Sequence, residues 1–428
     1  MKTTIRWLLL AGLAAALAAC GGGLLGNQGR IRLVNATTGI GALDLVIDNE
    51  AVALGVATTS ASDYVLRKAD TYSIDIRQSG SAATLLTTST ALVADKHQTL
   101  VAYNSGGTMA ATFLDDEESD PARTKAKFRV FNTATATADQ VDVYLVTAAC
   151  NTLDTSAAAP TAAGVSGLQS AYTELASSAT VYHLCVTSTG DKSDVRLEIP
   201  SFVLSEKRIV TVILARGAGG YLMNAIVLEQ QGAGTQALNA SARARVATSV
   251  SPGDVSVTVN GATIATGLPA PNVGPYVLVP AGPVTVTVNG AGVTPVAPLA
   301  AAPGADVTVL LTGTTTTLLA DDNTPSSSTA RPVKLRLVNG LNGTSSTATL
   351  ALNSVPVGSG ALPGQASGYT QVASSLNSAR LEAKIGALTF YLNPSATLEA
   401  NRVYSLFLLG DGSGPPALPN VGILVPDR

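Results

Sequence analysis

Charged and apolar residues alternate with a period of two at four places along the chain. Such alternation predicts β-strands, because successive side chains of a strand point to opposite faces of its sheet. The basic side chains would then share one face and the apolar side chains the other. The four stretches read RIRLVN, KFRVFN, RARVAT and KLRLVN, and they begin at Arg30, Lys127, Arg243 and Lys334.

Further elements follow each stretch in the same order: a second alternating strand, a tyrosine, more short strands and a late apolar strand. The tyrosines are Tyr64, Tyr172, Tyr276 and Tyr369. About seven short strands in each run of about 80 to 110 residues are typical of an immunoglobulin-like sandwich. Asn260-Gly261 is a strong hairpin signal, since both residues tolerate positive φ. We therefore predict an all-β protein of four tandem Ig-like antiparallel β-sandwich domains.

Three polar stretches divide the chain between these repeats. They read DDEESDPARTK, QQGAGTQALNAS and DDNTPSSSTARP. Stretches rich in Pro, Gly, Ser and Asp usually stay solvated, so we interpret them as linkers. The predicted β-sandwiches span residues 30–118, 125–232, 242–322 and 333–428.

The opening Arg-x-Arg-Leu-Val-Asn-Ala, the Val-Asp-Val-Tyr strand, the later tyrosine and the late Thr/Val strand resemble the domain of unknown function 4397 (DUF4397) family. The resemblance implies a bacterial envelope protein, often a lipoprotein, with such units in tandem, and it brings no established activity. Ser256 and Thr349 stand where the motif has an aspartate. The resemblance is best at Arg32, Asn35, Asp44, Arg129, Asn132, Asp142 and Tyr144.

The first 29 residues predict export and a lipid anchor. Lys2 and Arg6 precede an apolar run from Trp7 to Ala19, which is too short to span a bilayer as a helix. Leu-Ala-Ala-Cys20 resembles a lipobox, so we expect residues 1–19 to be a lipoprotein signal peptide and Cys20 to be acylated. The alternative is an ordinary signal peptide with an incidental cysteine. Residues 20–29 are Gly-rich and predict a flexible tether.

Composition limits the partners. Only 13% of residues are charged and the formal net charge is −3. A chain without a basic stripe is a poor match to phosphate backbones, so we expect no nucleic-acid partner. The expected location is the bacterial cell envelope, lipid-anchored in the outer membrane on its periplasmic face or at the cell surface.

The sequence offers little for catalysis. His97 lies in a polar turn sequence and is expected to be a solvated loop residue. His183 lies in a strand and is expected to be an edge or half-buried histidine and not a catalytic base. Two histidines in different units do not make a zinc site, and no G-x-S-x-G elbow surrounds a serine. We therefore expect no catalytic residue, no metal and no cofactor, and the protein is not predicted to be an enzyme.

The acidic runs at 115–118 and 321–322 have two interpretations. Interdomain carboxylates can bind calcium, but these runs lack the D-x-[DN]-x-[DN]-G spacing of a calcium-binding loop. A charged, solvated linker is therefore the preferred interpretation. The recurring Arg32, Arg129, Arg245 and Arg336 similarly suggest either a binding row or local pairing with carboxylates on the same sheet face. Local pairing is preferred.

Two cysteines remain once Cys20 is acylated. Cys150 and Cys185 both lie in the second unit of an exported chain, where oxidising conditions favour a bridge. We predict a disulfide between them; the alternative is two unpaired buried thiols.

These features together suggest a membrane-anchored envelope lipoprotein with a structural, adhesive or ligand-presenting role. Tandem sandwiches are expected to form a rod whose loops contact an envelope protein or other macromolecule. The alternative is a non-catalytic module that binds envelope glycan or polysaccharide.

Overall fold

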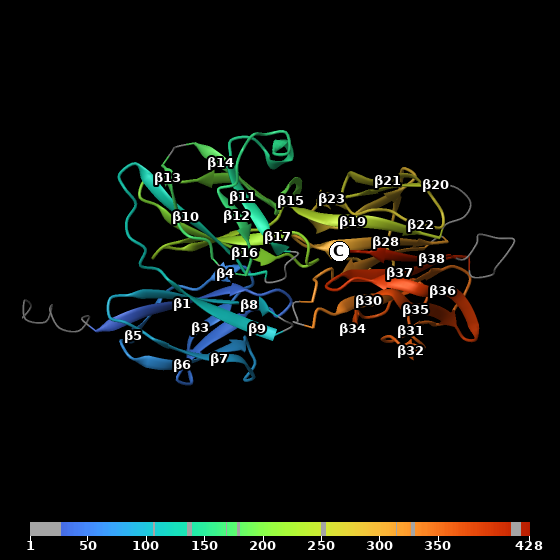
Figure 1. Cartoon of the computed structure of the whole chain (residues 1–428), viewed down its shortest axis with the longest axis horizontal. Helices are drawn as coiled ribbons and strands as arrows, with labels where there is room; N and C mark the ends of the chain where they lie inside the picture. Colours follow the sequence, from blue (N-terminus) through green and yellow to red (C-terminus); the bar gives the residue numbers. More distant parts are fainter. Residues whose placement is uncertain are drawn as a thin grey trace, which may run out of the picture.

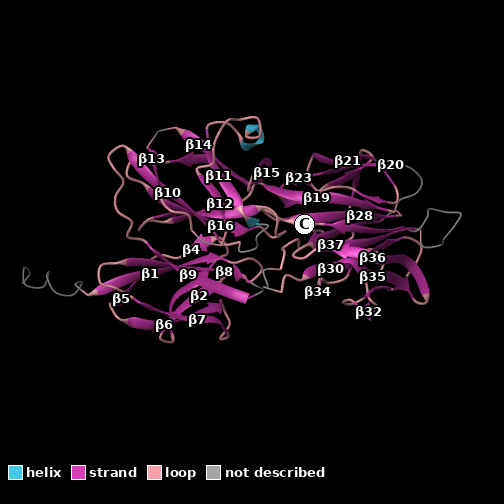
Figure 2. Cartoon of the chain, in the orientation of Figure 1, coloured by secondary structure: helices cyan, strands magenta, loops and turns pink. Residues whose placement is uncertain are grey.

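The computed structural model describes residues 27–105, 108–134, 139–167, 169–177, 180–249, 254–313, 315–326, 330–411 and 421–428. Strands dominate these residues (Figure 2), and the 3-10 turn η2 spans Cys150–Thr152. No helix in the described ranges is long and apolar enough to cross a membrane. The all-β sandwich prediction is confirmed.

The strands lie in four consecutive units (Figure 1). Unit 1 has β1 (Gln28–Ala36), β2 (Leu43–Ile47), β3 (Glu50–Val56), β4 (Ser60–Ala61), β5 (Val65–Lys68), β6 (Thr71–Gln78), β7 (Thr84–Ala91), β8 (His97–Ser105) and β9 (Thr108–Asp115). Unit 2 has β10 (Lys125–Asn132), β11 (Val141–Val146), β12 (Ala162–Val165), β13 (Thr173–Ala176), β14 (Val181–Ser188), β15 (Asp191–Val203), β16 (Ile209–Arg216), β17 (Met223–Glu229) and β18 (Gly234–Ala237).

Unit 3 has β19 (Ser241–Thr248), β20 (Asp254–Val259), β21 (Ala262–Pro269), β22 (Asn272–Val273), β23 (Val277–Pro280), β24 (Gly282–Pro283), β25 (Val286–Val288), β26 (Ala291–Val293), β27 (Ala300–Ala301), β28 (Asp306–Thr312) and β29 (Thr315–Asp321). Unit 4 has β30 (Val333–Leu341), β31 (Ala348–Leu352), β32 (Val355–Pro356), β33 (Gln365–Ala366), β34 (Thr370–Val372), β35 (Ser375–Ile385), β36 (Leu388–Leu398), β37 (Val403–Gly410) and β38 (Val421–Pro426).

Each unit is a sandwich of two main sheets. The first sheet holds the opening strand of the unit between short strands on one side and the late apolar strand on the other, as in β4-β1-β8-β9. The second sheet repeats the order seen in β3-β2-β6-β7. The opening and late strands pair in parallel in every unit, whereas the other pairs are antiparallel. A parallel pair needs a long connection, and the second sheet supplies it.

Alternation within the opening strand divides its side chains between two apolar environments. In unit 1, Ile31 and Leu33 point into the sandwich and pack on Leu45 and Ile76 of the second sheet. Corresponding cores fill the other units. The predicted Asn260-Gly261 turn is confirmed, with φ of 49° and 80° where β20 meets β21.

The opposite face of the first sheet is also buried. Val34 and Val101 of unit 1 pack there against Phe131, Ile213 and Ile226 of unit 2. In units 3 and 4 the same faces meet through a core of Ala247, Leu310, Val338, Phe407 and Leu409. We call this outer face of the first sheet the pairing face.

The units therefore associate as two face-to-face pairs, 1 with 2 and 3 with 4, placed side by side (Figure 1). The expected rod of separate sandwiches is wrong, because the pairing faces carry apolar side chains that are buried between units. The stretch expected to link units 2 and 3 also differs: residues 234–237 form β18, which extends the first sheet of unit 2.

Candidate functional site

The recurring arginines form the same contacts in all four units. Each lies on the pairing face of the opening strand, beside a hydroxyl residue at the matching register position of the late strand. The Nε atoms of Arg32, Arg129, Arg245 and Arg336 donate to Thr99 (2.7 Å), Thr211 (2.8 Å), Thr308 (2.9 Å) and Ser405 (2.8 Å). The Cζ atom of each guanidinium also lies over the ring of the recurring tyrosine. Its distance from the ring centre is 4.3 Å for Tyr64, 4.3 Å for Tyr172, 4.4 Å for Tyr276 and 4.6 Å for Tyr369.

Three units add an aspartate at the end of the last strand. Asp116 in unit 1 accepts hydrogen bonds from Tyr64, Thr99 and Arg32, the last at 3.3 Å. Asp321 and Asp427 occupy the corresponding register positions in units 3 and 4. All three carboxylates are buried. The expectation of plain solvated linkers is therefore wrong for Asp116 and Asp321.

Units 3 and 4 exchange these carboxylates. Arg336 of unit 4 binds Asp321 of unit 3, and Arg245 of unit 3 binds Asp427 of unit 4 at 2.5 Å. Both side chains are almost fully buried, with exposed fractions of 1% for Arg245 and 2% for Arg336. Burial alone would raise the pKa of Asp321, but the Arg336 and Arg245 guanidiniums hold it below its usual value. Arg32 pairs within its own unit as predicted, whereas Arg245 and Arg336 pair most closely across the interface.

Units 1 and 2 are joined by bonds from Arg32 to the backbone of unit 2, and not by exchanged carboxylates. The side chain of Arg32 crosses to backbone carbonyls of Glu229, at 3.2 Å, and of Gly232 in unit 2. Gln230 stands where the other units have the aspartate, and its side chain binds the backbone of Glu118. Arg129 is left with a buried Nη2 that has no hydrogen-bond partner among the described residues.

Lysines fix the two acidic stretches in place. Lys127 binds the Glu118 carboxylate and both oxygens of Ser119. Lys334 donates to Asp322 Oδ2 at 2.6 Å and to two backbone carbonyls, those of Asp322 and Thr324. These stretches thus lie along the seam of each pair.

A second charged cluster joins units 2, 3 and 4 at the centre of the molecule. Asp139 is fully buried and contacts Arg196, Arg216 and Arg428. Burial opposes ionisation, but the three guanidiniums lower the pKa of Asp139. This cluster has no repeat signal in the sequence, because its residues occur once. Asp427 belongs instead to the recurring aspartates, and an alignment of the unit ends indicates it.

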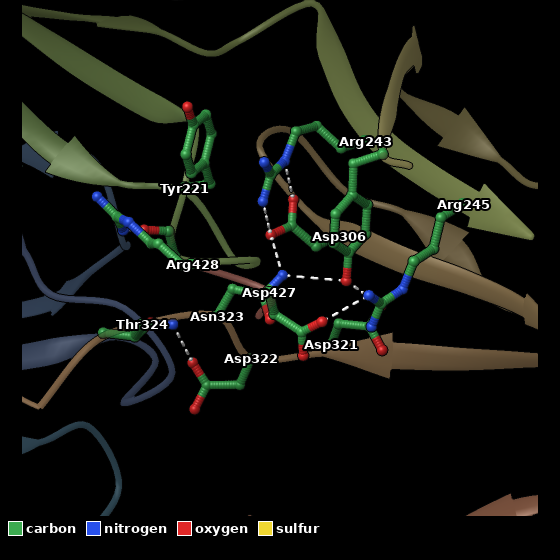
Figure 3. Close-up of polar contacts among 12 residues, drawn as sticks. Tyr221, Arg243, Arg245, Asp306, Asp321, Asp322, Asn323, Thr324, Asp427 and Arg428 are labelled. Atoms are coloured by element: carbon green, nitrogen blue, oxygen red, sulfur yellow. Dashed lines mark hydrogen bonds and ion pairs between the residues drawn. The ribbon is translucent and has the colours of Figure 1, made fainter. Parts of the chain in front are cut away.

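Tyr221 lies between Arg428 of this central cluster and Arg243 of unit 3 (Figure 3). Arg243 of unit 3 lies 3.7 Å from the centre of its ring, and Arg196 lies 4.1 Å away. Burial and a hydrogen bond to Asp194 raise the pKa of Tyr221 to about 12. Arg243 is in turn held by Asp306, with bonds of 2.8 and 2.6 Å.

The family-like motif residues have structural roles. Asn35 donates from Nδ2 to the carbonyls of Gly41 and Val56, and Asn132 does the same to two carbonyls of unit 2. Asp44 accepts from the Gly55 amide and Asp142 from the Gly164 amide. Where the aspartate is absent, the Ser256 hydroxyl accepts from the Gly267 amide.

The predicted cysteine and histidine residues lie in units 1 and 2, apart from Cys20. The Cys150–Cys185 disulfide is confirmed, and both cysteines are buried. His183 is half-buried as predicted and contacts Glu198 at 2.6 Å. The solvated-loop prediction for His97 is wrong: it begins β8, its side chain is 14% exposed, and it contacts Glu117 at 2.8 Å. Cys20 lies outside the described residues.

In the described part of the chain, no group of three or more His, Cys, Asp or Glu side chains is placed to hold a metal ion. The acidic runs are instead engaged by Arg32, Lys127, Lys334 and Arg336.

These features define a multi-unit β-sandwich protein whose recurring polar residues hold strands and units together. Residues 29–144 match the family model described as "Domain of unknown function (DUF4397)", which confirms the resemblance over unit 1 and the first strands of unit 2. No curated protein matches the chain.

Two solved structures are similar at low identity. "The Bacillus anthracis TIE protein" is 9% identical, covers 91% of this chain and 68% of its own, with a TM-score of 0.14. A "putative cell adhesion protein from Bacteroides ovatus ATCC 8483" is 10% identical, covers 71% of this chain and 98% of its own, with a TM-score of 0.16.

Proposed function

We propose that this protein is a bacterial envelope lipoprotein, anchored through an acylated Cys20, with a structural or adhesive role. It would present the outer sheets and loops of a rigid four-unit body to other macromolecules. The observation that carries this proposal is the reciprocal pairing of Arg245 with Asp427 and of Arg336 with Asp321. Breaking a buried ion pair is costly, so the relative orientation of the paired units is fixed.

A non-catalytic role is part of the proposal. The recurring arginines, tyrosines and aspartates form bonds mainly with one another and with the backbone. Catalytic groups, by contrast, need to reach a substrate. The two histidines sit in different units, each against a glutamate.

The anchor is tested by detergent partitioning. We expect the mature protein to enter the detergent phase and a Cys20→Ser variant to stay in the aqueous phase, because two or three acyl chains bind a bilayer far more firmly than a tether does. Partitioning of Cys20→Ser like the wild type would contradict the anchor. Protease treatment of intact cells then separates display at the cell surface from a periplasmic location.

The role is tested by attachment. Cells that lack the gene, cells that express the wild type and cells that express Cys20→Ser are compared for adhesion to surfaces and to one another. We expect only the wild type to restore adhesion. Equal adhesion of all three strains argues against the proposal, and capture of the soluble chain beginning at Arg30 on immobilised polysaccharide would favour a glycan-binding module instead.

A further inference from the structure

A cleft of about 440 Å³ lies where units 1, 2 and 4 meet the segment that joins units 3 and 4. Its size is within the usual range for small-ligand sites, which often form at domain interfaces. Its walls include Asn104 from β8, Arg216 from the end of β16, Asp322 from the joining segment, and Lys334, Tyr369 and Gln371 from unit 4. The cleft therefore exists only in the assembled chain.

The unused hydrogen-bonding groups of this cleft are mainly donors. Arg216 binds Asp139 through Nε and Nη2, and its Nη1 has no partner among the described residues. Asn104 accepts from the Thr38 amide through Oδ1, while its Nδ2 is unused in the described chain. The Tyr369 hydroxyl is buried and has no hydrogen-bond partner among the residues that the structure describes, and the Gln371 amide is exposed.

The cations that line the cleft are Arg216 and Lys334. Asp139 holds Arg216 through Nε and Nη2, and Asp322 neutralises Lys334. An anchored arginine with a free Nη is well suited to a charge-assisted hydrogen bond with an anionic oxygen.

We infer that this central cleft binds the oxyanion, carboxylate or phosphate, of a small sugar-sized solute. The oxyanion would accept hydrogen bonds from Arg216 Nη1 and from the amides of Asn104 and Gln371. This site does not depend on the proposed anchoring or adhesion, so each can fail without the other.

Titration calorimetry of the purified protein tests the site with glucuronate, glucose 6-phosphate, inorganic phosphate and, as the uncharged probe, glucose. We expect at least one anion to bind with a dissociation constant below about 10 mM and glucose not to bind. Tighter binding of glucuronate identifies a carboxylate ligand, whereas tighter binding of either phosphate probe identifies a phosphate ligand. No anion binding, or equal binding of glucose, overturns the inference.

Two isosteric variants tie binding to the cleft. Gln371→Glu and Asn104→Asp each replace a donor by a carboxylate, and Asn104→Asp keeps the acceptor used by the Thr38 amide. We expect each to weaken anion binding at least about tenfold, because a lost charge-assisted bond and added repulsion both oppose the ligand.

Controls separate binding from folding. Gln365→Glu makes the same charge change on an exposed residue of unit 4 that does not line this cleft, and it should bind as the wild type does. Wild-type affinity in both Gln371→Glu and Asn104→Asp overturns the assignment of the cleft.

Discussion

Arg336 of unit 4 and Asp321 of unit 3 form a buried ion pair although they belong to different sandwiches. Asp321 also accepts hydrogen bonds from Tyr276 at 2.5 Å and from Thr308 at 2.6 Å, both within its own unit. One carboxylate thus completes the polar core of unit 3 and neutralises an arginine of unit 4. The two units depend on each other through it.

Replacing Asp321 should therefore destabilise the protein strongly. Asp321→Asn leaves the Arg336 charge buried without a counter-charge, and we expect a loss of about 3–5 kcal/mol in the free energy of unfolding. Urea denaturation followed by circular dichroism measures the loss. Asp63→Asn, at an exposed aspartate, is the control and should change stability by less than about 0.5 kcal/mol. A loss in Asp321→Asn as small as in the control would show that the pair is not needed.

The Arg245–Asp427 pair should be coupled across the interface. We expect Arg245→Met and Asp427→Leu each to destabilise the protein and the double variant to lose less than their sum, because it removes both charges together. The coupling free energy should be about 1–3 kcal/mol in a double-mutant cycle. Additive losses would mean that the two residues stabilise their units independently.

The disulfide should stabilise unit 2 mainly by restricting its unfolded chain. It closes a loop with a sequence separation of 35 residues. On the chain-entropy model, Cys150→Ala with Cys185→Ala should lower the free energy of unfolding by about 3–4 kcal/mol. Mass spectrometry of the non-reduced wild type provides the control, since two free thiols there would refute the bridge.

Stability should fall in acid. The pKa values of Asp139, Asp321 and Asp322 are lowered from an ordinary value of 3.8, because nearby cations outweigh the effect of burial. Between the folded and the unfolded pKa the unfolded chain binds more protons, so the free energy of unfolding decreases as the pH drops through and below about 3.8. Asp306 opposes this trend, since burial raises its pKa.

Urea midpoints at pH 7, 4 and 3 check this dependence. The wild type should lose stability over this range, and Asp321→Asn should lose less, because one of the responsible carboxyls is gone. An identical pH dependence in the two proteins would contradict the assignment to Asp321.

Local elements could be predicted from the sequence because their signals are local. Alternation around Ile31 and Leu33 gives the strand and its core face, and Asn260-Gly261 gives the turn. The Cys150–Cys185 bridge was predicted from the expected export and from the number of cysteines. The arginine contacts were predicted correctly for Arg32, which pairs in its own unit. They were not predicted for Arg245, because its partner Asp427 lies 182 positions later in the chain.

The pairing of units was missed because the arginines were expected to pair with carboxylates on their own sheet face, within each unit. Val34 lies on that same face and is fully buried. A stronger signal was present in the late strands: β16 and β37 are apolar at nearly every position, and such runs indicate burial on both faces of a sheet. The central cluster around Asp139 had no comparable signal, since its members come from distant, unrepeated positions.

The parallel pairing of opening and late strands has a consequence for how the chain matures. The arginine of the opening strand donates to a hydroxyl residue that comes 67, 82, 63 or 69 positions later in the chain, in units 1 to 4 respectively. Such distant contacts form slowly, and a chain that emerges N-terminus first cannot close a unit until nearly all of that unit is available. Each unit thus remains open during synthesis and closes after its last strands have been made.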